Sequence, residues 1–140
     1  MLFGPEHVQR YVETDGKEGH DWQGTSVLIL TTTGRRTGRK HPTPLIYQEH
    51  DGSFLVVASK GGADAPPAWY LNLQADPDVE VQVWGERFAA RARTASEAEK
   101  PALWRAMTRA WPAYNDYQRK TDRVIPVVLL DRAPLARRPA

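Results

Sequence analysis

The chain has 140 residues, a formal charge of +2 and a pI near 9.0, with 41% hydrophobic and 26% charged residues. These values are typical of one soluble globular domain with a substantial core. The absence of cysteine excludes disulfides and thiolate chemistry and fits a reducing cytoplasm, where we expect the protein. No apolar run approaches the roughly 18 residues of a membrane span and no signal peptide is visible, so at most peripheral membrane contact is expected.

The first 24 residues predict a short helix and a loop. Residues 5–12 place proline in a first turn and apolar residues on one face, which is typical of a helix. Residues 15–24 are polar and rich in glycine, which favours a loop. We therefore expect a helix and loop at 1–24, the main domain at 25–131, and a basic flexible tail at 132–140.

The next segment predicts strands joined by turns. The apolar run in residues 25–33 predicts a buried strand. An extended segment at 41–49 contains two prolines, which remove two backbone donors and favour a sheet edge or barrel rim. The triplet His50-Asp51-Gly52 predicts a hairpin turn into an apolar strand at 54–58.

The second half of the chain predicts three more strands and three helical segments. A glycine-bearing loop at 59–64 precedes a short helix that begins after Pro67. Ser96 and Glu99 form a capping box for a helix that should run to about residue 111, before Pro112. The remaining expected elements are strands at 79–83, 87–94 and 124–130 and a helix at 113–121. About six strands with hairpin-like links predict a mainly β (α+β) fold, an antiparallel barrel or curled sheet.

The stretch from Thr31 to Lys40 combines two glycines with three arginines and a lysine directly after the first strand. Glycine allows close approach of the backbone, and arginine offers a planar fork for phosphate or carboxylate. An anion site and a solvated basic hairpin are about equally well supported by this turn alone. The spacing excludes a Walker loop, and no GxGxxG, GxSxG or HExxH motif occurs. The four histidines lack metal-ligand spacing, so we expect no metal.

Aromatic residues gather near the two glycine-bearing loops. Cationic loops beside aromatic walls suit a large, flat, negatively charged cofactor. Trp69 and Tyr70 are equally compatible with a core position. Tyr114 and Tyr117 fit either a packing stripe or a partly exposed lid, with Trp111 close by in sequence.

Several motifs, in order, resemble the actinobacterial deazaflavin-dependent nitroreductase family. The resemblance covers about residues 26–131. It rests on Leu30-Thr-Thr-Thr-Gly-Arg-Arg-Thr-Gly38, Pro44-Leu45, Ala58-Ser-Lys-Gly-Gly62, Trp69-Tyr-Leu-Asn-Leu73, Tyr114-Asn-Asp-Tyr-Gln118 and Thr121-Asp-Arg-Val-Ile-Pro126. It implies an antiparallel split β-barrel related to FMN-binding flavoproteins, with coenzyme F420 as hydride carrier.

The resemblance also implies a set of site residues. The catalytic or substrate-contacting residues would be Ser59, Trp111, Tyr114 and Tyr117, where Ser59 or a tyrosine hydrogen-bonds or protonates the acceptor. The cofactor would contact Arg35, Arg36, Thr37, Arg39, His41, Pro42, Thr43, Pro44, Leu45, Ile46, Val57, Ala58, Ser59, Lys60, Ala68, Trp69, Tyr70, Leu71, Asn72 and Tyr114.

The chain departs from the family pattern at three places. Trp111 stands where the best-known member has tyrosine, and Ile46 rather than tyrosine follows Pro44-Leu45. The amino-terminal extension is also shorter and less amphipathic than membrane attachment would require. The cofactor expectation is unaffected, but nitroimidazole prodrug activation does not follow.

The leading hypothesis is an F420H2-dependent reductase that passes hydride to a small electron-poor acceptor, namely a quinone, activated alkene or nitroaromatic. The alternatives are a non-catalytic carrier of F420 or a flavin-like ligand and an FMN-dependent reductase of the same fold. A basic nucleic-acid-binding barrel is ranked well below these, because acidic residues nearly balance the basic ones. A homodimer is expected only by analogy with similar barrels.

Overall fold

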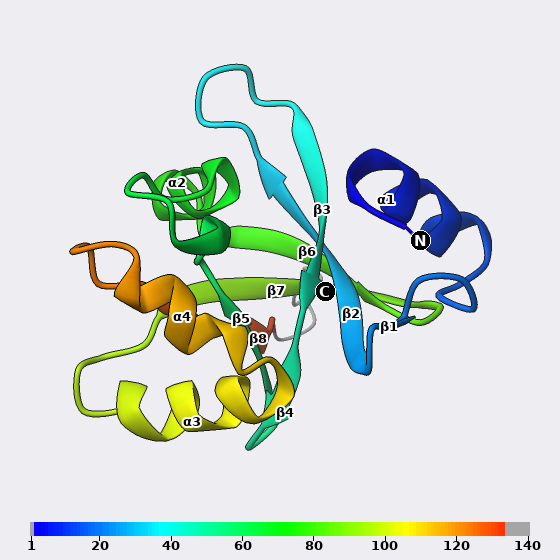
Figure 1. Cartoon of the computed structure of the whole chain (residues 1–140). Coiled ribbons are helices and arrows are strands. Elements are labelled where there is room, and N and C mark those ends of the chain that lie inside the picture. The colour runs from blue at the N-terminus through cyan, green and yellow to red at the C-terminus, as the bar shows by residue number, and fades with distance from the viewer. Residues whose placement is uncertain (1, 134–140) are drawn as a thin grey trace.

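The computed structural model describes residues 2–133 and consists of a curled antiparallel sheet with helices around it (Figure 1). In Figure 1, α1 lies on one side of the β2–β3 arm, and α2, α3 and α4 lie on the other. The strands are β1 (Asp21–Trp22), β2 (Thr25–Thr33), β3 (Lys40–Ile46), β4 (Gln48–His50), β5 (Ser53–Val57), β6 (Asp78–Val83), β7 (Glu86–Thr94) and β8 (Val127–Arg132). The helices are α1 (Gly4–Glu13), α2 (Ala68–Ala75), α3 (Lys100–Ala110), α4 (Ala113–Arg119) and the 3₁₀ turn η1 (Lys60–Gly62).

The sheet has eight strands in the order β1-β2-β6-β7-β8-β5-β4, with β3 paired to β2. All the pairs are antiparallel, so the expected fold class is confirmed. The predicted count of six strands was too low because β1 lies in the segment expected to be a loop, and the extended segment at 41–49 divides into β3 and β4. Pro42 and Pro44 lie opposite Thr31 and Ile29, so this edge strand tolerates their missing donors.

Element boundaries also differ from the expected ones, and the helix expected at 113–121 ends at Arg119. The predicted capping box forms, since the Ser96 N–H donates to Glu99 Oε1 at 2.9 Å and the Glu99 N–H donates to Ser96 Oγ at 3.2 Å. It closes a turn ahead of α3, which begins at Lys100. The last strand begins at Val127 instead of residue 124, directly after Pro126. It continues through Arg132, so the first residue of the expected tail belongs to the strand, and residues 134–140 lie outside the described residues.

The strands β2 and β5 are buried on both faces, which explains their continuous apolar sequences. Leu28 and Val56 pack inside the curl of the sheet. The adjacent Leu55 and Val57 point the other way, toward α3 and α4. On β2, the residues that alternate with Leu28 pack against Tyr11 of α1. Helices thus cover the outer faces that the curl does not enclose.

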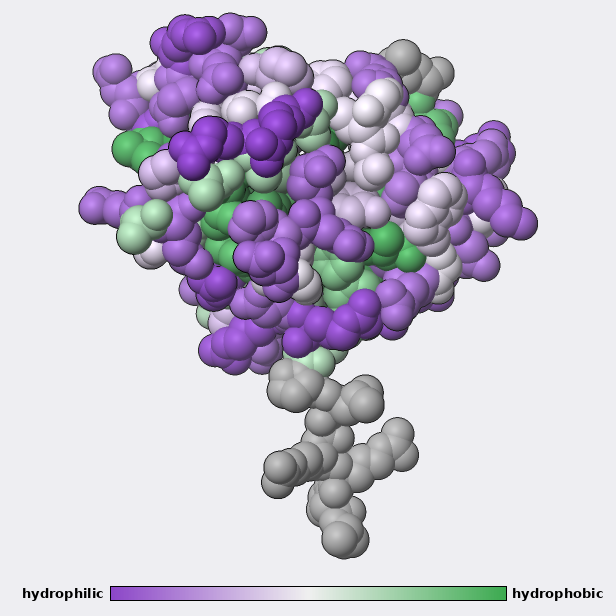
Figure 2. Space-filling view, turned by 90° about the horizontal axis from the view of Figure 1, so that it is seen from below, coloured by the Kyte–Doolittle hydropathy of each residue, from purple (hydrophilic) through white to green (hydrophobic). Residues whose placement is uncertain are grey.

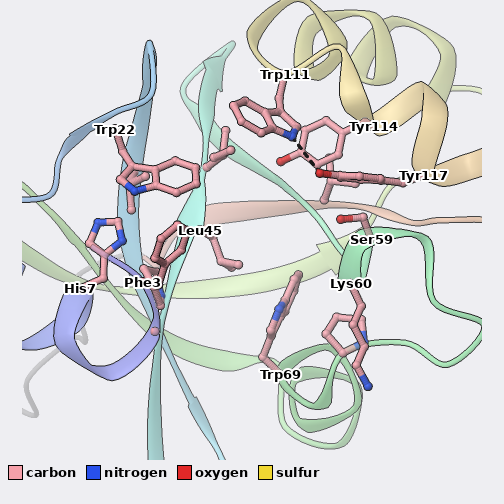
Figure 3. A pocket seen from close by; sticks show the side chains of 17 residues that line it. Phe3, His7, Trp22, Leu45, Ser59, Lys60, Trp69, Trp111, Tyr114 and Tyr117 are labelled. Atoms are coloured by element: carbon pink, nitrogen blue, oxygen red, sulfur yellow. Dashed lines mark hydrogen bonds between the residues drawn. The ribbon is translucent and has the colours of Figure 1, made fainter. Parts of the chain in front are cut away.

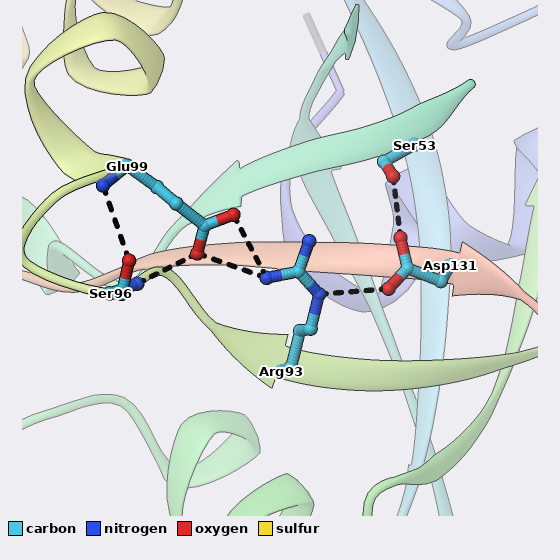
Figure 4. Close-up of polar contacts among 5 residues, drawn as sticks. All are labelled: Ser53, Arg93, Ser96, Glu99 and Asp131. Atoms are coloured by element: carbon cyan, nitrogen blue, oxygen red, sulfur yellow. Dashed lines mark hydrogen bonds and ion pairs between the residues drawn. The ribbon is translucent and has the colours of Figure 1, made fainter. Parts of the chain in front are cut away.

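An ion-pair network joins the capping box ahead of α3 to the strands (Figure 4). Arg93 of β7 donates from Nε to Asp131 Oδ2 at 3.0 Å and from Nη1 to Glu99 Oε1 at 3.0 Å. Ser53 Oγ donates to the other oxygen of Asp131. One guanidinium therefore connects the capping box to β8, and through β8 to β5.

The face of the molecule seen from below is mixed in character (Figure 2). Hydrophobic side chains gather near its middle and hydrophilic side chains border them. Within residues 2–133, no helix has the length and apolar character needed to cross a bilayer.

Candidate active site

Two adjoining cavities share the side chain of Trp69. The aromatic cavity, of about 420 Å³, is lined by Phe3, Gly4, His7, Trp22, Val27, Pro44, Leu45, Ile46, Val57, Ser59, Lys60, Gly61, Pro67, Trp69, Trp111, Tyr114 and Tyr117. The basic cavity, of about 590 Å³, is lined by Gly34, Arg35, Arg36, Thr37, Arg39, His41, Pro42, Thr43, Ala68, Trp69 and Asn72. Both volumes fall in the range of small-molecule and cofactor sites.

The basic turn owes its shape to backbone hydrogen bonds between its glycines and Arg39. The Gly34 N–H donates to the Arg39 carbonyl at 2.7 Å, and the Gly38 N–H donates to the Gly34 carbonyl at 2.9 Å. Gly38 has a φ of 73°, which favours glycine. Tight closure leaves the side chains of Arg35, Arg36 and Arg39 exposed at the basic cavity.

Asn72 of α2 fixes the orientation of Arg35. Its Oδ1 accepts from the Arg35 backbone N–H at 3.2 Å and from Arg35 Nη1 at 3.0 Å. Its Nδ2 donates to Thr32 Oγ1 at 3.3 Å, and the side chain is buried. Because an amide is neutral, Asn72 orients the guanidinium and leaves its positive charge available to a ligand.

At one end of the aromatic cavity, Ser59, Tyr114 and Tyr117 present their hydroxyl groups (Figure 3). Trp111 Nε1 donates to the Tyr117 hydroxyl at 3.3 Å, and the rings of Tyr114 and Tyr117 meet edge to face at 6.0 Å. The Ser59 side chain is 8% exposed, and its hydroxyl has no hydrogen-bond partner among residues 2–133. Burial, with a smaller contribution from Tyr117, raises the pKa of Tyr114 well above its ordinary value. The Tyr114 hydroxyl is therefore neutral at neutral pH.

Residues from the amino-terminal segment complete the aromatic cavity, a position not predicted from their sequence. The Trp22 and Trp111 rings lie 5.9 Å apart, and Phe3 meets Trp22 edge to face at 5.7 Å. The Trp22 indole N–H donates to the Leu2 carbonyl at 2.9 Å. The available signal was a tryptophan in an otherwise polar, glycine-rich segment, which is an uncommon place for a large aromatic side chain.

The structure brings most of the predicted site residues to one of the two cavities. Ala58, Tyr70 and Leu71 line neither. Ala58 is fully buried and presents its carbonyl to Arg123. Tyr70 belongs to the core inside the sheet, and its hydroxyl lies 2.8 Å from Thr94 Oγ1. Trp69 and Tyr70 both belong to the core cluster inside the sheet, as the core interpretation predicted, and Trp69 in addition lines both cavities.

The electrostatic character of the site is one-sided. The chain has 17 acidic residues, yet none of those in the described part lines either cavity. The described residues also contain no cluster of histidines and carboxylates that would hold a metal ion. The site therefore offers cations, aromatic surfaces and neutral hydroxyl donors, a combination that favours an anionic, partly flat ligand.

Comparison with known proteins gives a consistent result. Residues 4–132 match the sequence profile of the F420H(2)-dependent quinone reductases. An F420H(2)-dependent quinone reductase of Mycobacterium tuberculosis (strain H37Rv) is 38% identical over 130 residues, covering 90% of this chain and 87% of the relative.

Solved structures agree with this match. An F420-H2 dependent reductase, FDR-A, is 39% identical with a TM-score of 0.70, covering 75% of this chain and 93% of its own. A protein described as a domain-swapped dimer is 35% identical with a TM-score of 0.73, covering 90% and 95%. A pyridoxamine 5'-phosphate oxidase-like protein of Listeria innocua, 11% identical with a TM-score of 0.54, shares the fold alone. The split-barrel expectation is confirmed, and the chain belongs to the F420H(2)-dependent quinone reductase family.

Proposed function

We propose that this protein transfers a hydride from reduced coenzyme F420 to a quinone. The observation that carries the proposal is the pairing of a basic cavity, free of acidic side chains, with an aromatic cavity that ends in neutral hydroxyl donors. A deazaflavin with a phosphate and a polyglutamate tail combines a flat ring with an anionic chain. The donor set of the two cavities fits that combination.

The cofactor-binding role falls to both sides of Trp69. Arg35, Arg36 and Arg39 would bind the anionic chain, because guanidinium groups pair well with phosphate and carboxylate. The edge strand at Pro44–Ile46 and the ring of Trp69 would flank the flat ring. When bound, the reduced deazaflavin supplies the hydride from its C5 position.

The acceptor role falls to the hydroxyl end of the aromatic cavity. A quinone gains one hydride and one proton when it becomes a hydroquinone, and negative charge develops on its oxygen as the hydride arrives. Ser59 and Tyr114 would donate hydrogen bonds to that oxygen, which stabilises the developing charge. Since its raised pKa keeps Tyr114 protonated, we assign the proton itself to solvent and the hydrogen bond to Tyr114.

The aromatic rim supports water exclusion. Trp22 and Trp111 approach each other from opposite ends of the chain, with Phe3 against Trp22. Their rings would cover a bound quinone and provide flat surfaces for stacking. Positioning and exclusion of water then account for the chemistry without an acid–base pair.

The test is a kinetic titration. Purified protein is mixed with F420H2 and menadione, a soluble naphthoquinone, and formation of oxidised F420 is followed by its absorbance. Saturable turnover is expected, and the double variant Arg35→Gln/Arg36→Gln should weaken F420 binding about 10- to 100-fold. Tight F420 binding without turnover of menadione or other acceptors would instead indicate a carrier. Binding of FMN but not F420 would move the protein to the flavin-dependent reductases.

Two further features belong to the same proposal. One similar solved structure is a domain-swapped dimer, and we propose that this protein is also a homodimer, which sedimentation equilibrium would check. We also propose a cytoplasmic location, supported by a chain without cysteine. Cell fractionation would check that location.

A further inference from the structure

The loop that carries Ser59 has an unusual backbone. Three successive residues have positive φ: Lys60 at 46°, Gly61 at 63° and Gly62 at 86°. A non-glycine residue in this region is strained, so the conformation persists only when its surroundings hold it. Within the loop, the Gly62 N–H donates to the Ser59 carbonyl at 2.9 Å and the Ala63 N–H donates to the Lys60 carbonyl at 3.2 Å.

Arg123 provides the external support. Its guanidinium donates from Nε to the Ala63 carbonyl at 2.9 Å, from Nη1 to the Ala58 carbonyl at 3.1 Å, and from Nη2 to the Ser59 carbonyl at 2.8 Å. These three acceptors lie at both ends of the loop. Arginine suits this task because its donors have fixed planar geometry.

The segment around Arg123 is itself fixed by Gln118 at the end of α4. Gln118 Nε2 donates to the Arg123 carbonyl at 2.8 Å, and the Ile125 N–H donates to Gln118 Oε1 at 2.9 Å. In addition, Thr121 Oγ1 donates to Asp64 Oδ1 at 2.8 Å. The same helix bears both tyrosines that line the aromatic cavity, so the loop and these tyrosines are attached to one structural unit.

We propose that Arg123 is a positioning residue for hydride transfer: by binding both ends of the loop, it holds the Ser59 hydroxyl within hydrogen-bonding distance of the acceptor oxygen. The inference rests on the proposed quinone reduction for the role of Ser59. Residues 121–126 line neither cavity, and the proposal gives this segment a function. It also makes the position of the Ser59 side chain depend on an arginine about sixty residues away in the sequence.

The first measurement uses the cofactor-free protein. Hydrogen exchange of the Gly62 and Ala63 amides is compared between the wild type, Arg123→Gln and Arg119→Gln. Arg119 lies on α4 and makes an exposed ion pair with Asp116 of that helix. Its variant therefore removes the same charge as Arg123→Gln and leaves the hydrogen bonds to the loop in place. We expect exchange at the two loop amides to rise at least tenfold in Arg123→Gln only. Unchanged exchange in Arg123→Gln would show that Arg123 does not hold the loop.

The second measurement is the rate constant kcat at saturating F420H2 and menadione, below the unfolding temperature of each variant. A displacement of about 1 Å can cost a hundredfold in rate, so Arg123→Gln should lower kcat about 10- to 100-fold, with partial recovery in Arg123→Lys. In a Ser59→Ala background, Arg123→Gln should have almost no further effect on kcat. Fully additive effects would contradict positioning through Ser59.

The two measurements separate the possible failures. If the wild type reduces no quinone, the proposed function is wrong, and the exchange data still decide whether Arg123 holds the loop. If the wild type is active but Arg123→Gln keeps its kcat, the positioning role is wrong while the proposed function stands. If Arg123→Gln does not fold, Arg123→Lys retains the charge and carries both measurements.

Discussion

Asn72 offers a way to separate the stability of the basic turn from its charge. In Asn72→Ala, Arg35 loses two hydrogen bonds and Thr32 loses one. A neutral hydrogen bond contributes about 1 kcal/mol and a charge-assisted one about 1.5 kcal/mol or more. The free energy of unfolding should therefore fall by about 3 kcal/mol, or about 10 °C in Tm for a chain of this size. F420 affinity should fall as well, because Arg35 is no longer oriented.

Asn72→Asp is the matched variant. The carboxylate keeps an oxygen in place for both hydrogen bonds of Arg35, so most of the stability should be retained. It also adds a negative charge beside the arginine that would bind the anionic chain. At about 7 Å in a largely aqueous environment, that repulsion is about 0.6 kcal/mol, which predicts roughly threefold weaker F420 binding.

Thermal unfolding and fluorescence titration of F420 are measured on the same samples, at low and high salt. Relative to the wild type, Asn72→Asp should regain more F420 affinity at high salt than Asn72→Ala does. Salt screens the charge repulsion in Asn72→Asp, but it does not restore the orientation of Arg35 in Asn72→Ala. If Asn72→Asp binds F420 as tightly as the wild type at low salt, the charge of Arg35 does not contribute to binding. The assignment of the basic cavity to the anionic chain would then fail.

Three other predictions concern stability. Gly62→Ala places Cβ 2.5 Å from the Tyr117 carbonyl oxygen at a residue with positive φ, so the free energy of unfolding should fall by more than about 2 kcal/mol. Gly61→Ala also has positive φ but meets no neighbouring atom, so it should lower the free energy of unfolding by about 1 kcal/mol. Urea unfolding measures both variants. Burial raises the pKa of Tyr47 to about 12. The unfolded tyrosine ionises first, so wild-type stability should fall above about pH 10, and Tyr47→Phe should flatten that fall in a series of thermal melts. Arg93→Leu removes two exposed ion pairs and should cost about 1 kcal/mol at low salt and less at high salt; an equal loss at both salt concentrations would contradict the electrostatic explanation.

The parts of the fold that follow from sequence are those with local causes. The boundaries of β2 match the predicted strand because an apolar run ends at a glycine turn. The turn at His50-Asp51-Gly52 formed as predicted, with Asp51 and Gly52 both at positive φ. β1 could not be predicted because a strand of two residues carries no periodicity, and only its pairing with β2 defines it.

The candidate site shows the same division. The basic turn and the Ser59 loop follow from glycine and charge patterns within ten residues. The contact of Trp22 with Trp111 joins residues 89 positions apart. The hydrogen bond from Arg123 to the Ser59 carbonyl joins residues 64 positions apart. No local pattern encodes such pairs, because they depend on how the sheet curls. Arg123 in particular reads as an ordinary surface arginine next to an aspartate, and only its three carbonyl partners show its role in holding the loop.

The absence of a recognisable catalytic motif follows from the charges that the site must tolerate. A carboxylate close to the reacting ring would repel the anionic chain of F420 and the negative charge that develops on a reduced acceptor. The residues that remain useful are cations at one end and neutral hydroxyl donors at the other, and the two cavities are lined in that way. Arginines, serine and tyrosines form no short signature of their own. We therefore expect the chemistry to depend on the spatial order of common residues, which explains why the motifs are specific only as an ordered set.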